Sequence, residues 1–158
     1  ITAGYAVSVL VSLMAHYALW RFPEPMPERL GMLTLLALLL TAVGTLLGGI
    51  WADQSWGRFW GWDPKENGAL LIVLWLTWLL HGRIAGQIGE KWYLAGLCGT
   101  SVMVALAWFG VNLLSVGLHS YGFTEGTAWG LVGFIGLEVL AVAGLVFNAG
   151  GKKVAHAA

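Results

Sequence analysis

Charge and cysteine are both scarce in this sequence. Only 10% of its 158 residues are charged, and eight basic residues balance eight acidic ones. This sparse, even charge excludes a nucleic-acid-binding surface and a long-range field that would steer a charged ligand. The single cysteine, Cys98, lies within an apolar run. A disulfide framework, a CxxC redox pair and a thiolate metal site are therefore excluded as well.

Long hydrophobic runs dominate instead. Hydrophobic residues make up 58% of the chain, which is above the range of soluble domains. A helix needs about 20 apolar residues to cross a hydrocarbon core of roughly 30 Å. The runs that qualify are Ile1 to Trp20, Leu30 to Trp51, Ala69 to Leu80, Trp92 to Leu118 and Thr127 to Ala149. The sequence therefore predicts an all-α, polytopic transmembrane helical bundle with about five transmembrane helices.

Two of these runs are incomplete at one end. The third is short, so its helix must begin within the turn at residues 63–66 or end below the bilayer centre near His81. Pro64 in that turn suits a first helical turn. The first run starts at Ile1, with no methionine and no charged segment before it. We therefore expect the chain to be a piece of a longer protein that lacks its N-terminal part.

Basic residues predict the orientation of the helices, because they gather on the inner side of a membrane. The presumed inner connections and the C-terminal tail hold six of them: Arg21, Arg29, Arg83, Lys91, Lys152 and Lys153. The opposite side holds only Arg58 and Lys65. We expect the segment around these two residues to face outward from a bacterial inner membrane, and a thylakoid membrane fits equally well.

Residues 51–67, here called the tryptophan-rich segment, carry the most specific pattern. They place four tryptophans and two aspartates between two apolar runs, and we expect them to form an outward-facing loop. Indole rings offer large flat surfaces and one N–H donor each, which suits a flat aromatic ligand such as a porphyrin. Tryptophans also anchor ordinary proteins at membrane interfaces. Interface anchoring is therefore an alternative interpretation for Trp51, but it explains Trp56, Trp60 and Trp62 together poorly.

Ionisable residues at membrane depth are candidates for function. His119 ends the fourth run and shares a helical face with Trp108, Asn112 and Ser115. His81 and His16 lie at similar depths towards the inner side, so their imidazoles could meet there. The alternatives are an interface residue for His119 and simple helix packing for His16. Glu138, in the fifth run, is either a proton or ion site or a hydrogen-bonded residue of the bundle.

Two motifs resemble the CcsA-type cytochrome c assembly proteins, a family of haem-handling membrane proteins named for a WWD motif. The first is Trp-Gly-Trp-Asp-Pro-Lys-Glu at residues 60–66, and the second runs from Phe109 through Gly-Leu-His-Ser-Tyr-Gly at residues 117–122. The resemblance covers roughly residues 1–122, the C-terminal half of such a protein, and residues 1–158 are expected to form one membrane domain. Asn67-Gly68 departs from the bulkier residues expected after the first motif.

The resemblance implies a haem b site and its ligands. Haem would be bound outside the membrane, with Trp56, Trp60, Trp62 and Asp63 against the ring and His119 as one of two outer iron ligands. The other outer ligand would precede Ile1. His81 would be the transmembrane ligand. Its partner would lie in a CcsB-type membrane subunit or fused domain, with His16 considered as a substitute.

The resemblance also implies an activity. Haem would be held for thioether attachment to the CxxCH motif of an apocytochrome c, which would make the protein the haem-handling component of a holocytochrome c synthase, and haem would also be moved across the membrane. Arg58 or Lys65 would pair with haem propionates. Two alternatives remain: a haem exporter or chaperone that forms no bond, and a structural membrane subunit without a ligand.

Overall fold

The described part of the chain consists of helices joined by short connections, without strands. The computed structural model describes residues 1–110, 113 and 125–155. The helices in this part are α1 (Thr2–Arg21), α2 (Glu28–Trp56), α3 (Pro64–Ile84), α4 (Glu90–Cys98), α5 (Thr100–Trp108) and α6 (Glu125–Ala155). The predicted all-α membrane bundle is confirmed.

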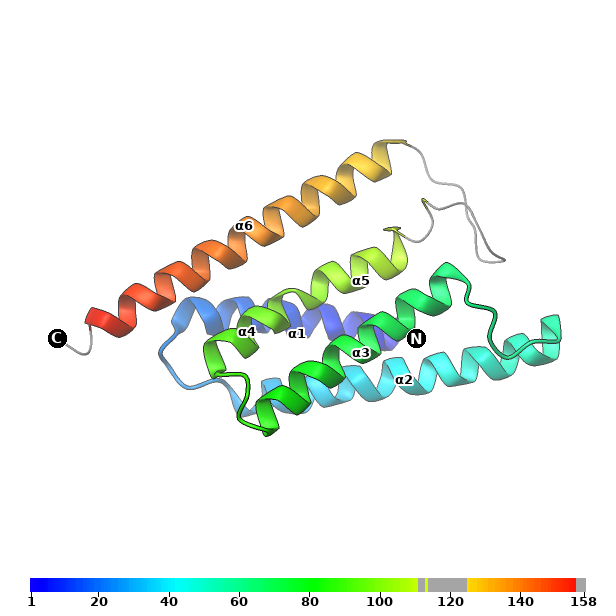
Figure 1. Cartoon of the computed structure of the whole chain (residues 1–158), viewed down its shortest axis with the longest axis horizontal. Coiled ribbons are helices and arrows are strands. Elements are labelled where there is room, and N and C mark those ends of the chain that lie inside the picture. The colour runs from blue at the N-terminus through cyan, green and yellow to red at the C-terminus, as the bar shows by residue number, and fades with distance from the viewer. Residues whose placement is uncertain (111–112, 114–124, 156–158) are drawn as a thin grey trace.

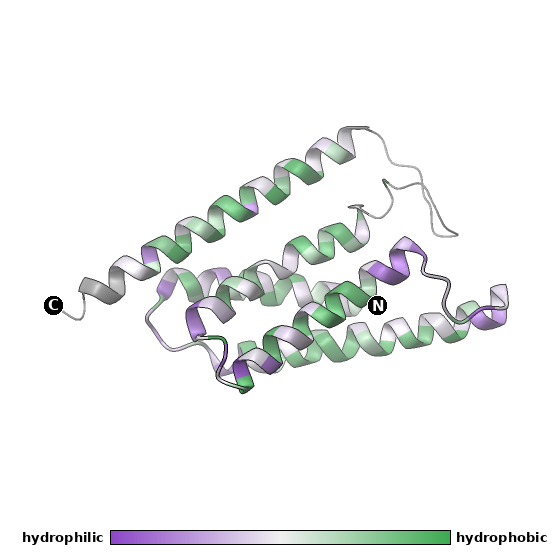
Figure 2. Ribbon diagram, viewed as in Figure 1, coloured by the Kyte–Doolittle hydropathy of each residue, from purple (hydrophilic) through white to green (hydrophobic). Residues whose placement is uncertain are grey.

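Apart from α4 and α5, which follow one another in the same direction, successive helices run in opposite directions, so that their connections lie at the two ends of the bundle (Figure 1). Four described helices are long and apolar enough to cross a membrane: α1, α2, α3 and residues Gly126–Gly151 of α6. Figure 2 shows hydrophobic residues along the helices and hydrophilic ones near their ends. Helix α3 begins at Pro64, within the predicted turn, and its N-terminal extension gives the short third run its full length.

The fourth apolar run departs from the prediction of one continuous helix. It contains two nine-residue helices, α4 and α5, with a break at Gly99. The carbonyl of Cys98 accepts a hydrogen bond from the hydroxyl of Ser12 at 2.6 Å and lies 3.0 Å from the hydroxyl oxygen of Ser101. The amide of Val102 bonds instead to the carbonyl of Gly99, at 3.1 Å. Side chains inserted into a helical hydrogen-bond ladder interrupt it in this way. The rest of the predicted run, residues 111–112 and 114–118, lies outside the described residues.

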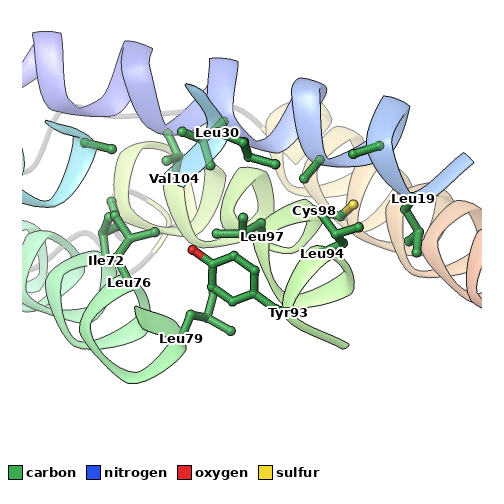
Figure 3. Packing of buried hydrophobic residues seen from close by; sticks show 14 of the residues in the cluster. Leu19, Leu30, Ile72, Leu76, Leu79, Tyr93, Leu94, Leu97, Cys98 and Val104 are labelled. Atoms are coloured by element: carbon green, nitrogen blue, oxygen red, sulfur yellow. The ribbon is translucent and has the colours of Figure 1, made fainter. Parts of the chain in front are cut away.

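Buried side chains of α1, α2, α3, α4 and α5 form the core, part of which Figure 3 shows. Tyr93 of α4 is almost fully buried, beside Leu79 of α3 and Leu97 of α4. Cys98 is buried in the same cluster. Apolar side chains on the outer faces of α2 and α6 are exposed, as expected for helices that face lipid.

Helix α6 lies on one side of the bundle, against α1, α4 and α5. Of its described residues only Ala149 is buried. The helix therefore covers the bundle loosely and leaves space along α1 and α5.

Candidate functional site

The tryptophan-rich segment is part helix and part loop. Helix α2 continues to Trp56, so the irregular stretch is limited to residues 57–63, shorter than the predicted loop at 51–67. Gly57 ends the helix with φ of 70°, and its amide donates to the carbonyl of Asp53 at 2.9 Å. A left-handed residue at this position favours glycine, which has no side chain to clash with the backbone.

The other end of the loop is fixed by the start of α3. Asp63 caps the helix by accepting from the amide of Lys65 at 3.0 Å, and Pro64 occupies the first helical turn. The carboxylate of Glu66 reaches back and accepts from the amides of Gly61, at 2.8 Å, and Asp63, at 3.1 Å. This is a capping box extended by one further loop amide. One acidic side chain therefore holds two separate points of the loop.

Trp62 has an unusual backbone conformation. Its φ is 57°, the only positive value at a described residue other than glycine. Bulky side chains rarely adopt this left-handed region, which costs about 1–3 kcal/mol. The Asn67 side chain donates to the carbonyl of Trp62 at 3.0 Å and helps to hold this conformation. Trp62 is 69% exposed in this conformation.

Two close contacts pack the loop against itself and against α2. The guanidinium of Arg58 occupies the space where a side chain at Gly61 would lie. The ring of Phe59 covers Gly49 of α2, where an added Cβ would come within 2.8 Å of the ring. Both glycines therefore permit contacts that hold the loop in one arrangement.

The tryptophans of the segment form two edge-on pairs. Trp51 and Trp56 lie 5.0 Å apart between ring centroids at 78°, and Trp60 and Trp62 lie 6.0 Å apart at 87°. Such geometries are favoured because the positive edge of one ring meets the negative face of the other. The pairs hold flat surfaces in fixed directions at this end of the bundle.

A cavity of about 340 Å³ lies beneath the loop. Its lining includes Trp51, Phe59, Trp60, Lys65, Glu66 and Trp108, with Tyr5 and the first residues of α1 on the far side. Within the described part of the chain, the buried indole N–H of Trp60 has no hydrogen-bond acceptor. Leaving a buried donor unpaired costs about 1–3 kcal/mol. An acceptor supplied by a ligand would remove this penalty.

Of the histidines predicted as iron ligands, the structure describes His81 and His16, and neither lines this cavity. His119 lies outside the described residues. His81 lies near the end of α3, about 27 Å along the helix from Asp63 at 1.5 Å per residue. It is exposed, and its Nδ1 lies 2.8 Å from the carbonyl of Thr77.

His16 is not brought together with His81. Among the described helices, α1 contacts α2, α4, α5 and α6 but not α3. The Nε2 atom of His16 lies 3.2 Å from a carboxylate oxygen of Glu138 on α6. Glu138 is therefore hydrogen-bonded within the bundle, which was one of the two readings of its sequence position.

The departure at residues 67 and 68 has a structural reason. Gly68 is buried where α3 crosses α5, and an added Cβ would lie 2.8 Å from the Cα atom of Ala107. Bulkier residues would push these helices apart. Asn67 holds the loop through Trp62, as described above.

Two residues of this site were missed by the sequence interpretation, Phe59 and Tyr5. Phe59 lies inside the tryptophan-rich segment, and the run of aromatic residues there was a usable signal. Trp108, which the sequence analysis placed on one helical face with His119, lines the cavity, but its partner Tyr5 was not foreseen. Their ring centroids lie 5.7 Å apart. Tyr5 comes from an apolar helix distant in the chain, so only the folded structure reveals it.

Comparison with known proteins agrees with these features. A family model described as Cytochrome C assembly protein matches residues 1–119. The chain belongs to this family. The matched residues include the tryptophan-rich segment, His119, and Tyr5 and Trp108, which line the cavity from other helices. Helix α6 lies beyond the match.

Individual relatives match a shorter part. The "Cytochrome c biogenesis protein CcsA" of Parasynechococcus marenigrum is 43% identical over 89 residues, which are 56% of this chain and 29% of the relative. The protein of the same name from Pinus thunbergii is 44% identical over 87 residues, or 54% of this chain and 27% of the relative. The matched part of the chain thus spans less than a third of these relatives. No solved structure matches the chain.

Proposed function

We propose that this protein acts in cytochrome c biogenesis by holding haem b at the outer membrane face for covalent attachment to an apocytochrome c. The observation that carries the proposal is the tryptophan-rich segment of a cytochrome c assembly protein, built as a fixed aromatic surface over a cavity. Family membership supports the pathway, and the segment supports a flat aromatic substrate.

The chemistry of the cavity fits haem as the substrate. Trp60 and Trp62 offer one ring edge-on to the other, so a macrocycle could stack on an exposed face. The unpaired N–H of Trp60 suits a carboxylate acceptor, and Lys65 lines the same cavity. Both groups suit haem propionates. The cavity, about 340 Å³, is at the small end of ligand sites. Part of the ring would therefore remain accessible to a second substrate.

Attachment requires the haem vinyl groups to meet two cysteine thiols. Each thiol S–H adds across one vinyl C=C bond, forming a C–S bond while the hydrogen goes to the neighbouring carbon. No group leaves and no side chain of this chain has to act as a nucleophile. Fixing the ring plane and presenting one edge would supply the acceleration through proximity and orientation. In this proposal His119 is an iron ligand on the outer side, and His81 takes haem within the membrane.

The proposal also includes partners and a location. A CcsB-type membrane subunit or fused domain would complete the haem sites, and the CxxCH segment of an apocytochrome c would be the second substrate. The loop would face the periplasm of a bacterial inner membrane or the lumen of a thylakoid. The basic residues at the opposite end of the bundle support this orientation.

Co-expression with a CcsB-type partner and an apocytochrome c tests the proposal. We expect haem to copurify with the complex and covalent haem to appear on the cytochrome. Trp60→Ala should weaken haem retention about tenfold, as expected for loss of one aromatic contact worth roughly 1–1.5 kcal/mol. His119→Ala should weaken the low-spin absorption bands. Trp92→Ala, an exposed tryptophan at the other end of the bundle, is the matched control.

Other outcomes point to the alternatives. Haem that accumulates on the complex without reaching the cytochrome would identify an exporter or chaperone. Absence of haem in wild type and variants alike would show that the tryptophans only anchor the protein at the membrane interface.

A further inference from the structure

A second and larger cavity lies within the membrane-spanning part of the bundle. It measures about 700 Å³ and is bounded by α1, α5 and α6. Most of its wall is apolar, and Tyr5, Trp108, Phe109 and Phe134 place aromatic rings around it. Its volume is in the range of sites for small molecules. Because α1 and α6 are long and apolar enough to cross a membrane, a ligand would reach the cavity between them from the lipid.

Polar side chains gather at one part of this wall. His16 from α1, Ser101 from α5 and Glu138 from α6 all line the cavity. The hydroxyl of Ser101 donates to Glu138 at 2.7 Å, and Nε2 of His16 lies 3.2 Å from the same carboxylate oxygen. The three helices that form the cavity thus meet in one hydrogen-bonded cluster.

The contact of Nδ1 defines the tautomer of His16. This atom lies 2.8 Å from the carbonyl of Ser12, and a carbonyl oxygen can only accept. Nδ1 therefore carries a proton, and Nε2 faces Glu138. The side chains of His16 and Glu138 keep exposed fractions of 23% and 13%, so both remain accessible from the cavity.

This arrangement selects a neutral polar head group. A carboxylate at Glu138 would repel an anionic head group, and its Oε1 atom already faces Ser101 and His16, so it is not open to a cationic one. A carbonyl or hydroxyl can join the cluster without adding a charge to an apolar cavity, where an unpaired charge is costly. The aromatic walls favour a flat ring beside that head group.

We propose that the cavity between α1, α5 and α6 binds a lipid-soluble quinone or quinol, with its ring oxygen at the His16–Glu138 pair. A quinone oxygen accepts hydrogen bonds and a quinol hydroxyl also donates, and the cluster can offer both. The inference goes beyond haem handling. Helix α6, which supplies Glu138, lies outside the residues that match the family.

The cavity has a built-in optical reporter. Trp108 lines both this cavity and the one beneath the tryptophan-rich segment, and it packs against Tyr5, which also lines both. A quinone quenches the fluorescence of a nearby indole. Binding should therefore quench the emission of Trp108. The difference in quenching between wild type and a Trp108→Phe variant gives the contribution of Trp108 apart from the other tryptophans.

Titration of the complete protein in nanodiscs with a decyl-substituted benzoquinone tests the proposal without haem. We expect saturable quenching in wild type. His16→Leu should weaken binding about five- to tenfold, the effect of losing one hydrogen bond of roughly 1–1.5 kcal/mol. Gly130→Leu should weaken it at least as much, because Gly130 lines the cavity and has open space for a side chain. Gly136→Leu, also in open space on α6 but not lining the cavity, should bind like wild type.

Quenching that is linear and equal in wild type and in Gly130→Leu would show only partition into the bilayer and would overturn the proposal. Equal competition by a long-chain alcohol would overturn the assignment of a quinone and leave a site for any amphiphile with a hydroxyl head. Neither result depends on whether the protein binds haem, so failure here is separate from failure of the haem proposal.

Discussion

At the scale of single residues, Glu66 holds the loop of the candidate haem site at two points. Its carboxylate accepts from two loop amides, on either side of Trp62. Together with the Asn67 side chain it therefore stabilises the strained Trp62 backbone. Glu66 is three residues from the cap, where sequence alone predicts a capping box.

Removal of this carboxylate should loosen the loop. We expect Glu66→Ala to raise the hydrogen-exchange rates of the Gly61 and Asp63 amides by roughly five- to thirtyfold, since hydrogen bonds to a charged acceptor are worth about 1–2 kcal/mol when partly exposed. Glu24→Ala, which removes an exposed carboxylate paired with Arg21, should leave those amides unchanged. Equal exchange in both variants would mean that the loop is held by its aromatic contacts instead.

The sequence could predict the cap but not the tryptophan conformation. Asp63, Pro64 and Glu66 have local preferences that identify the start of a helix from a few neighbours. The left-handed conformation of Trp62 depends on closing the loop between two fixed helices. No local preference of tryptophan predicts it.

At the scale of elements, the division of the fourth apolar run into α4 and α5 is the main departure from expectation. Hydropathy is continuous across Gly99, so composition alone predicts one helix. The break depends on Ser12, which is 86 positions away and reaches the carbonyl of Cys98 from α1. Tertiary contacts of this kind are not visible in a hydropathy profile.

The same contact gives a prediction about stability. We expect Ser12→Ala to lower the free energy of unfolding by about 1–2 kcal/mol, because a fully buried inter-helix hydrogen bond is lost. Ser8→Ala is the matched control on the same helix, since Ser8 bonds only to the carbonyl of Gly4 one turn earlier. Denaturation in detergent by sodium dodecyl sulfate would measure both. A loss no greater than that of Ser8→Ala would contradict the role of Ser12.

At the scale of the whole molecule, the chain is a bundle with chemically different ends. The tryptophan-rich segment lies at one end, and the short connections rich in basic residues lie at the other (Figure 1). The amount of apolar sequence predicted this architecture well, because a membrane leaves few ways to satisfy backbone hydrogen bonds. Which helices contact one another, and hence the pairing of His16 with Glu138, was not predictable from run lengths.

The orientation can be checked by labelling single cysteines. In a Cys98→Ala background, we expect Gln54→Cys to react with a membrane-impermeant maleimide on intact cells, and Gln87→Cys to react only after permeabilisation. Both native residues are exposed. Gln54 lies near the C-terminal end of α2, and Gln87 lies just beyond the C-terminal end of α3, at the opposite end of the bundle. Labelling of Gln87→Cys alone in intact cells would reverse the assignment of the outer face and exclude an outward-facing loop.

The break at Gly99 also changes what the backbone of the fourth apolar run can bind. In a continuous helix the carbonyl of Cys98 would accept from the amide of Val102, but that amide bonds to the carbonyl of Gly99 at 3.1 Å. The Cys98 carbonyl accepts instead from the hydroxyl of Ser12 on α1, at 2.6 Å. A kink that looks like an interruption of a helix thus provides the backbone acceptor that joins two helices of the bundle.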